Sequence, residues 1–273
     1  MFRKDIKLVI CDIDGSLVTS DHRLTERAKS TIDRLHDRGI YFGIASGRSI
    51  EQHLSKQAKN WGFDYDFEIL IGLNGAELWD DINQKHNEYY KLKSEWLKEI
   101  IEMMEPFELN PFIYRDQMSL YYKVDPSVIA SAKRNKTKYK IVEDVAELYE
   151  KETAKILFRM SEEMMEKVEP YVMAHPSPYY RAFKTQTTVL EFADIRVNKA
   201  VPLKVFCDRN GINLAQVVAF GDMSNDNELL ETSGLGVCLL NGDKQTKAIA
   251  DVVTDKTNDE DGFAHFMEKY FLD

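Results

Sequence analysis

Two aspartates, Asp12 and Asp14, directly follow the apolar residues 8–11 and precede Gly15. An apolar, β-branched run of this kind predicts a buried parallel strand, which the glycine ends. Because side chains alternate along a strand, both carboxylates leave the sheet on the same side. Ligands of open α/β sheets bind outside the carboxyl ends of the strands, where paired carboxylates suit a hard cation such as Mg²⁺. An ordinary polar turn explains these residues equally well.

A second acidic group follows another predicted strand, residues 217–220, which ends in Gly221 and Asp222. All strands of a parallel sheet end at the same edge, so we expect Asp222 to approach Asp12 although the two lie far apart in the sequence. Asp226 lies four residues after Asp222, near the start of the next predicted helix. Helix capping is the alternative explanation for this acidic group.

Three further polar or small residues lie near the predicted starts of helices. Ser46 and Gly47 follow a predicted strand at residues 40–45, and the hydroxyl and nearby N–H groups there could hold an anion at a helix N-terminus. A simple N-cap explains Ser46 as well. Lys199 precedes a predicted helix, and as a lone lysine in a polar turn it would be solvated surface.

The elements around these residues alternate between strands and helices, which predicts an α/β fold with a doubly wound parallel sheet. Thr25 is the expected N-cap of the first helix, and Gly39 is expected to end it. A second helix is predicted from Ser49, which has capping-box spacing with Gln52. The dipeptide Asn74-Gly75 predicts a hairpin after a strand at residues 68–71.

The pattern changes in the middle of the chain. A predicted helix at residues 94–104 is followed by a predicted hairpin of residues 111–115 and 119–124, and a further helix is predicted at residues 126–136. Short strands with aromatic faces then predominate, which favours an inserted α+β domain with an antiparallel sheet. The expected domains are a core from residues 1–82 and 195–273, with residues 83–194 inserted as a cap.

Composition excludes several classes of protein. The net charge of −10 and the pI near 5.2 argue against a surface that binds nucleic acid. The three cysteines are widely spaced in apolar segments, so we expect buried free thiols and a reducing compartment. We identify no signal peptide and no apolar stretch of membrane-spanning length. A cytoplasmic protein without a membrane partner, either a monomer or a small homo-oligomer, is therefore expected.

Together these segments resemble the haloacid dehalogenase (HAD) superfamily hydrolases of the Cof type, cap subclass IIB. The resemblance covers essentially the whole chain and includes all four superfamily motifs in order. The matching stretches are Asp12-Ile13-Asp14-Gly15-Ser16-Leu17, Ala45-Ser46-Gly47-Arg48, Asn74-Gly75-Ala76, Asn198-Lys199-Ala200, Gly221-Asp222-Met223-Ser224-Asn225-Asp226 and the tail from Ala250-Asp251 to Asn258-Asp259-Glu260-Asp261-Gly262. Departures from the family pattern are Ser16 in place of Thr, Ala200 in place of Gly, and Cys238-Leu239-Leu240 in place of a small, Met-containing stretch.

The resemblance implies roles for the acidic residues. Asp12 would be the nucleophile that forms an aspartyl-phosphate, and Asp14 would be the general acid and then the general base. Mg²⁺ would be bound by Asp12, the backbone carbonyl of Asp14, and Asp222. Asp226 would orient Lys199 or the waters of the metal.

The resemblance also implies a phosphate-binding set, in which positive charge and hydrogen-bond donors surround the transferred group. Its expected members are Ser46, Gly47, Lys199 and Asn225. The inserted domain would close over the site and exclude water.

The function expected from these features is that of a Mg²⁺-dependent phosphatase of small phosphorylated metabolites, such as sugar phosphates or nucleotide-like cofactors. A phosphomutase or phosphotransferase on the same fold is the alternative enzyme. A dehalogenase is disfavoured because the expected metal and proton donor suit phosphate. A binding module without activity is disfavoured because Asp12, Asp14, Lys199 and Asp222 are all present.

Overall fold

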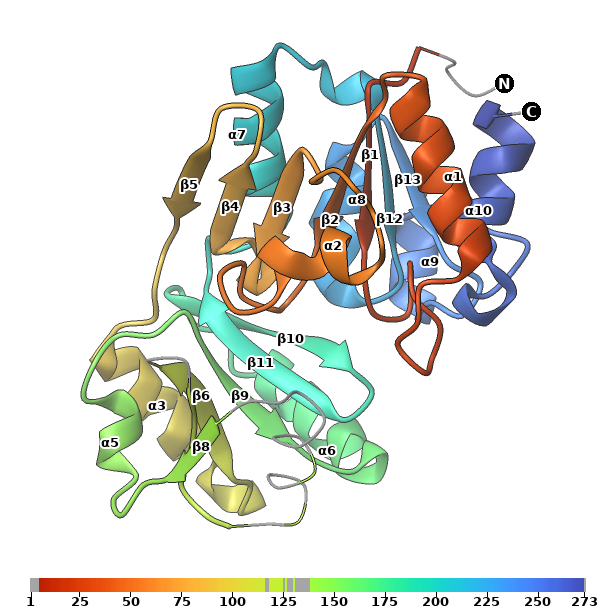
Figure 1. Cartoon of the computed structure of the whole chain (residues 1–273). Coiled ribbons are helices and arrows are strands. Elements are labelled where there is room, and N and C mark those ends of the chain that lie inside the picture. The colour runs from red at the N-terminus through yellow and green to blue at the C-terminus, as the bar shows by residue number, and fades with distance from the viewer. Residues whose placement is uncertain (1–4, 116–117, 125, 127–129, 131–137, 273) are drawn as a thin grey trace. The chain divides into compact units, whose positions relative to one another are not determined.

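The structure is a computed structural model that describes residues 5–115, 118–124, 126, 130 and 138–272 (Figure 1). It divides into two compact units. Tyr90–Val197 form one unit, and the described residues before and after this segment form the other. We call the latter the core unit and Tyr90–Val197 the second unit.

The core unit is built on an eight-stranded sheet in the order β14-β13-β12-β1-β2-β3-β4-β5. The strands from β14 to β3 run parallel, whereas β4 and β5 are antiparallel to their neighbours. This arrangement confirms the predicted α/β fold with a doubly wound, mainly parallel sheet. The strands are β1 (Leu8–Asp12), β2 (Tyr41–Ala45), β3 (Ile69–Gly72), β4 (Glu77–Asp80), β5 (Lys85–Glu88), β12 (Val217–Gly221), β13 (Leu235–Cys238) and β14 (Val252–Val253).

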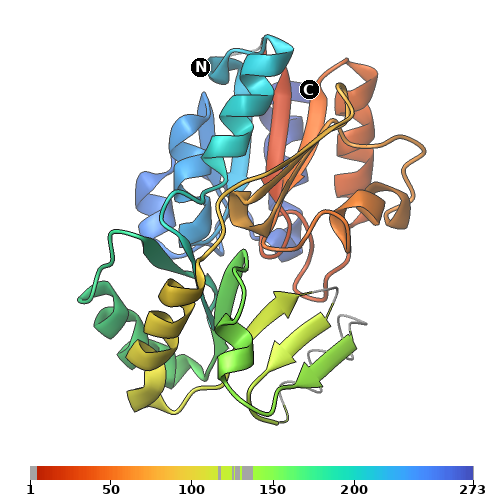
Figure 2. The same cartoon turned by 90° about the vertical axis from the view of Figure 1, so that its left-hand side faces the viewer.

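Helices cover both faces of this sheet, as the two views in Figures 1 and 2 show. Alternate residues of β1 pack on opposite sides: Val9 and Cys11 share a hydrophobic cluster with α1 and α10, and Leu8 and Ile10 share another with α7 and α8. Both clusters are buried, which fixes the register of β1. The helices are α1 (Glu26–Asp37), α2 (Gln57–Asn60), α7 (Ala200–Asn210), α8 (Asn227–Thr232), α9 (Lys244–Ile249) and α10 (Gly262–Met267).

Local signals in the sequence explain several of these boundaries. Thr25 is the N-cap of α1, and its hydroxyl accepts a hydrogen bond from Ala28 N, as predicted. Gly39 follows the same helix with a φ of 69°. The hairpin predicted at Asn74-Gly75 joins the antiparallel strands β3 and β4, and both residues have positive φ.

The helix predicted from Ser49 is wrong, because turns precede a short 3₁₀ segment, η1 (Leu54–Lys56), and α2. The backbone that would form its first turn is bound by the neighbouring hairpin instead. Ile50 N donates to the Glu77 carboxylate over 2.7 Å. Leu73 N donates to Arg48 O over 3.0 Å. These tertiary contacts override the capping-box signal.

The second unit contains a six-stranded sheet in the order β10-β11-β9-β6-β7-β8. Neighbouring strands are antiparallel except for β7 and β8. The predicted hairpin is therefore confirmed, as is the predicted helix at residues 94–104 (α3). The helix predicted at residues 126–136 lies largely outside the described residues. The elements are α3 (Ser94–Met104), β6 (Pro111–Arg115), β7 (Met118–Tyr121), β8 (Lys138–Ile141), α5 (Ala146–Tyr149), β9 (Lys155–Arg159), α6 (Glu162–Met173), β10 (Tyr180–Gln186) and β11 (Val189–Asp194).

Short helical turns complete the described structure. They are η2 (Leu73–Gly75), η3 (Glu105–Phe107), η4 (Leu214–Gln216), η5 (Ser224–Asp226), η6 (Asn258–Glu260) and the π-helical η7 (Glu268–Leu272). The three cysteines are buried and free, as expected. Within the described ranges, every helix is too short or too polar to cross a membrane.

Candidate active site

Asp12 is the last residue of β1 and is placed on the face of the sheet that α7 covers. Leu8 and Ile10 point to that face, and the alternation of the strand sends Asp12 the same way. Lys199 directly precedes α7, and its ammonium group lies 2.5 Å from Asp12 Oδ1 and 2.6 Å from Asp226 Oδ1. Its side chain is 0% exposed, so Lys199 is an internal cation and not solvated surface.

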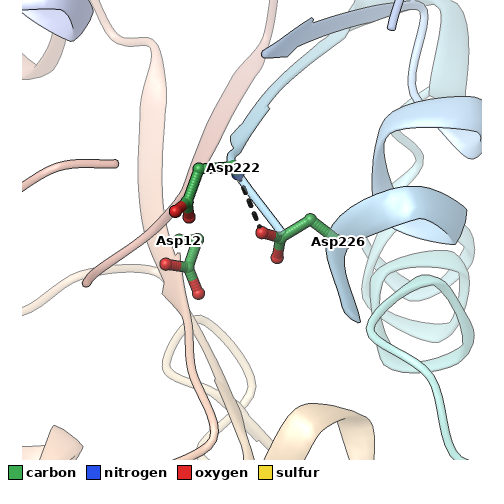
Figure 3. A group of neighbouring side chains, drawn as sticks. All are labelled: Asp12, Asp222 and Asp226. Atoms are coloured by element: carbon green, nitrogen blue, oxygen red, sulfur yellow. Dashed lines mark hydrogen bonds between the residues drawn. The ribbon is translucent and has the colours of Figure 1, made fainter. Parts of the chain in front are cut away.

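Asp222 reaches the same place because β12 pairs with β1 in parallel, with Cys11 opposite Phe220. The two strands therefore end side by side. Asp12, Asp222 and Asp226 each present a carboxylate oxygen, and these atoms all lie within 4.8 Å of one another (Figure 3). Asp226 accepts hydrogen bonds from the backbone N–H groups of Asp222 and Met223, which fix its orientation. The structure thus brings together acidic residues from two distant parts of the sequence.

When its three carboxylates are ionised, the acidic cluster carries more negative charge than Lys199 compensates. Burial raises the pKa of Asp12 to about 8, although the Lys199 ammonium opposes this shift. Burial, together with the charges of Asp12 and Asp226, also raises the pKa of Asp222 well above its ordinary value. Burial lowers the pKa of Lys199, but Asp12 and Asp226 outweigh it and raise that pKa above the ordinary value. Lys199 is therefore a permanent cation at neutral pH.

The donor set fits a hard divalent cation. Three buried carboxylates face a single ammonium group, so a bound cation would offset their remaining negative charge. Carboxylate oxygens are also the ligands that Mg²⁺ prefers. Gly15 lets the backbone beside Asp14 lie against this cluster: its φ is 84°, and a Cβ built there would lie 2.3 Å from Asp222 Oδ2. Ser16 completes the surroundings, because its hydroxyl donates to Asp222 Oδ1 over 3.2 Å.

Asp14 lies apart from the three clustered carboxylates and is 30% exposed. Arg48 Nη2 donates to its two oxygens over 2.6 and 2.7 Å. Nδ1 of His22 lies 2.9 Å from Asp14 Oδ1. Neither Arg48 nor His22 was among the expected site residues. The signal for Arg48 was its position directly after Ser46-Gly47, whereas nothing in the sequence pointed to His22.

The expected phosphate-binding residues also lie at the ends of core strands. Ser46 directly follows β2, is buried, and accepts a hydrogen bond from Arg48 N at its hydroxyl. Gly47 stands between these two residues and is partly buried. Asn225 Nδ2 donates to Asn74 Oδ1 over 3.1 Å, and Asn225 Oδ1 is buried without a hydrogen-bond partner among the described residues. Their role in binding phosphate stays a prediction.

Comparison with known proteins agrees with this fold and site. The family model described as haloacid dehalogenase-like hydrolase matches residues 9–267. A 5-amino-6-(5-phospho-D-ribitylamino)uracil phosphatase of Bacillus subtilis is 27% identical over 270 residues, which cover 97% of each chain. A second Bacillus subtilis phosphatase of the same name is 26% identical over 271 residues, covering 98% of this chain and 97% of its own.

Solved structures show the same fold. A haloacid dehalogenase-like hydrolase from Bacteroides thetaiotaomicron has a TM-score of 0.76 at 25% identity, with 97% of this chain and 100% of that chain covered. A haloacid dehalogenase-like hydrolase from B. subtilis has a TM-score of 0.81 at 21% identity, with 97% and 99% covered.

The fold and the site therefore define a hydrolase built around a buried acidic cluster at the carboxyl edge of a parallel sheet. The chain belongs to the haloacid dehalogenase-like hydrolases, and the predicted Cof-type, subclass IIB resemblance is confirmed. Within that family it is a phosphatase, a phosphoric monoester hydrolase.

Proposed function

We propose that this protein is a Mg²⁺-dependent phosphatase that hydrolyses monoesters of small phosphorylated metabolites through an aspartyl-phosphate intermediate. The observation that carries the proposal is the arrangement around Lys199. A buried ammonium group contacts both Asp12 and Asp226, and Asp222 lies beside them. Phosphoryl transfer depends mainly on positioning and on compensation of charge, and this cluster supports both.

Asp12 is the proposed nucleophile. One of its carboxylate oxygens attacks phosphorus and forms an acyl phosphate, the aspartyl-phosphate, while the bond between phosphorus and the leaving oxygen breaks. Lys199 favours the ionised form of Asp12 and supplies positive charge to the transferred phosphoryl group. Asp226 holds Lys199 in place through its own hydrogen bond to the ammonium group.

Asp14 is the proposed general acid and base. It gives a proton to the leaving oxygen in the first step and takes one from the attacking water in the second, which releases inorganic phosphate and restores Asp12. Arg48 and His22 hold its carboxylate by hydrogen bonds in this structure. Protonation of the leaving oxygen requires Asp14 to exchange at least part of these contacts for the substrate.

Asp12, Asp222 and the backbone carbonyl of Asp14 are the proposed ligands of Mg²⁺. When bound, the ion would neutralise negative charge and let two anions, the carboxylate and the phosphate, approach each other. Ser46, Gly47 and Asn225 are the proposed contacts of the phosphoryl oxygens, because they follow β2 and β12 at the edge where β1 also ends.

The substrate class rests on the related proteins. Two relatives that match nearly the whole chain are named as phosphatases of 5-amino-6-(5-phospho-D-ribitylamino)uracil, which is a phosphorylated sugar alcohol attached to a heterocycle. We propose that this protein acts on small monoesters of that general kind: phosphates of sugars, of polyols, or of nucleotide-like molecules.

The test is release of inorganic phosphate from p-nitrophenyl phosphate and a panel of sugar, polyol and nucleotide monophosphates. Wild type and the Asp12→Asn variant are each measured with Mg²⁺ and with EDTA. Phosphate release that requires both Mg²⁺ and Asp12 supports the proposal. A folded, Mg²⁺-loaded wild type that is inert across the panel contradicts it. Transfer of phosphate to an added sugar acceptor in place of water would identify a phosphotransferase.

A further inference from the structure

The loop that follows Asp14 is held by two asparagines from the C-terminal part of the core unit. Asn241 Nδ2 donates to Gly15 O over 2.7 Å. Asn258 Nδ2 donates to Val18 O over 2.9 Å. The two asparagines are themselves joined, since Asn258 N donates to Asn241 Oδ1 over 2.9 Å. A continuous hydrogen-bonded link, which we call the asparagine clamp, therefore connects two carbonyl groups of the loop.

The clamp is anchored on structured backbone. Asn258 is 6% exposed and is the first residue of η6. A capping box spans it, in which Thr257 N and the Thr257 hydroxyl both donate to Glu260 Oε2. Asn241 is exposed and lies in a turn closed by the hydrogen bond from Gly242 N to Leu239 O. Asn258 is thus the fixed member of the pair, and Asn241 is the accessible one.

The clamp acts on the segment that carries Asp14. Gly15 directly follows Asp14, and Val18 forms an isolated parallel bridge with Asp14. The asparagines therefore bind the carbonyl group of Gly15, which is next to Asp14 in the chain, and that of Val18, which forms a bridge with Asp14. Asp12 is held differently, because it is paired within the sheet and bound by Lys199. Loosening the clamp should displace Asp14 more than Asp12.

We propose that Asn241 and Asn258 are positioning residues for Asp14, which fix the proton donor relative to the nucleophile. This inference rests on the proposed function. It adds a role for residues 241–258, none of which takes part in the proposed reaction steps. A displacement of a reacting group by about 1 Å can lower the rate on the order of 10²-fold. Loss of the two hydrogen bonds that hold the loop beside Asp14 should therefore lower the rate measurably.

The test compares two substrates that differ in their need for a proton. p-Nitrophenolate leaves as a stable anion, whereas the alkoxide of a polyol phosphate leaves only with a proton. The ratio kcat/KM reports steps up to formation of the aspartyl-phosphate, so it includes protonation of the leaving oxygen and excludes hydrolysis of the intermediate. We expect Asn258→Ala to lower kcat/KM about 10- to 100-fold for the polyol phosphate and at most about 3-fold for p-nitrophenyl phosphate.

Asn241→Ala is the second variant, because the exposed position of Asn241 allows the protein to fold without its side chain. It should show the same selective loss with smaller magnitude. Asp14→Asn defines the full effect of losing the proton donor. Asn213→Ala is the matched control. Asn213 caps η4, which precedes β12 and so lies at the amino ends of the parallel strands, away from the site. This variant should leave the ratio of kcat/KM for the two substrates unchanged.

Thermal unfolding establishes that each variant is folded at the assay temperature. A selective loss with the polyol phosphate supports the inference. Equal losses with both substrates, or no loss in a folded variant, would overturn it, because neither result singles out the proton donor. Wild type that releases no phosphate from either substrate would instead contradict the proposed function.

Discussion

Lys199 donates a hydrogen bond to Asp12 over 2.5 Å, although 187 positions separate the two residues in the chain. Both side chains are almost fully buried. A buried charge without its partner is costly, because desolvation is then no longer compensated. We therefore expect a substitution of Lys199 to lower both the rate of phosphate release and the free energy of unfolding.

Lys199→Met keeps most of the side-chain volume and removes the ammonium group. We expect phosphate release to fall below about one thousandth of the wild-type rate, because positive charge at the transferred phosphoryl group is lost. The free energy of unfolding in EDTA should fall by about 3–5 kcal/mol, because buried carboxylates lose their partner. Urea titration measures this change.

The double variant Lys199→Met/Asp226→Asn is the control for the charge argument. It removes one of the carboxylates left without a partner, so part of the lost stability should return while activity stays low. If the double variant is as unstable as the sum of the two single variants, the pairing of Lys199 with Asp226 contributes little to stability.

Asp12→Asn should abolish turnover while it stabilises the protein in the absence of metal. An amide cannot form the aspartyl-phosphate, so phosphate release should fall by at least about 10³-fold with every substrate. Above about pH 8, where the wild-type carboxylate is ionised, the same change removes one negative charge from the buried acidic cluster. In EDTA at such a pH, the melting temperature of this variant should therefore exceed that of wild type. A melting temperature equal to or below that of wild type would contradict the charge argument.

The sequence predicted the acidic cluster because parallel strands end at one edge of a sheet. Asp12 and Asp222 each follow an apolar strand, and β1 and β12 turn out to be neighbours. The burial of Lys199 could not be predicted, because it depends on how α7 packs against the same face of β1. Local signals alone would have placed this lysine on the surface.

Two further differences between the expectations from the sequence and the structure also arise from contacts between distant residues. The contact of His22 with Asp14 needs a turn in which His22 has a φ of 60°. This conformation is uncommon for residues other than glycine, and no local pattern in the sequence indicates it. The capping-box spacing at Ser49 predicted a helix, but Glu77 binds the backbone at Ile50 instead. Non-local hydrogen bonds decide both cases, and they are invisible to patterns of local sequence.

The stability of the metal-free protein should fall as the pH rises. Burial raises the pKa of Asp12 from 3.8 to about 8. Across that interval the folded protein therefore binds more protons than the unfolded chain, and the free energy of unfolding declines with increasing pH. The raised pKa of Asp222 acts in the same direction. Mg²⁺ favours the ionised carboxylates, so it should raise the melting temperature most at the alkaline end.

Melting temperatures in EDTA and in Mg²⁺, recorded between about pH 5 and pH 8, measure this effect. Asp12→Asn serves as the control, because it cannot ionise at this position and its stability should depend less on pH. A wild-type protein whose metal-free stability follows the same pH dependence as Asp12→Asn would show that Asp12 does not titrate in this range.

Gly15→Ala should weaken metal binding selectively. A Cβ at this position would lie 2.3 Å from Asp222 Oδ2, so the carboxylate must move away from the cluster. The φ of 84° adds backbone strain of roughly 1–2 kcal/mol. Displacement of a ligand or its support typically lowers metal affinity about 10- to 100-fold, so the Mg²⁺ concentration for half-maximal activity should rise by that factor.

Gly211→Ala is the matched control for this substitution. Gly211 also has a positive φ, 65°, but a Cβ built there meets no atom within 4 Å. It should therefore show the backbone strain as a lower melting temperature and leave the Mg²⁺ requirement unchanged. If both variants need the same Mg²⁺ concentration for half-maximal activity, the close approach of Gly15 to Asp222 does not serve the metal site. If this concentration rises only in Gly15→Ala, Gly15 supports the position of Asp222 in the acidic cluster.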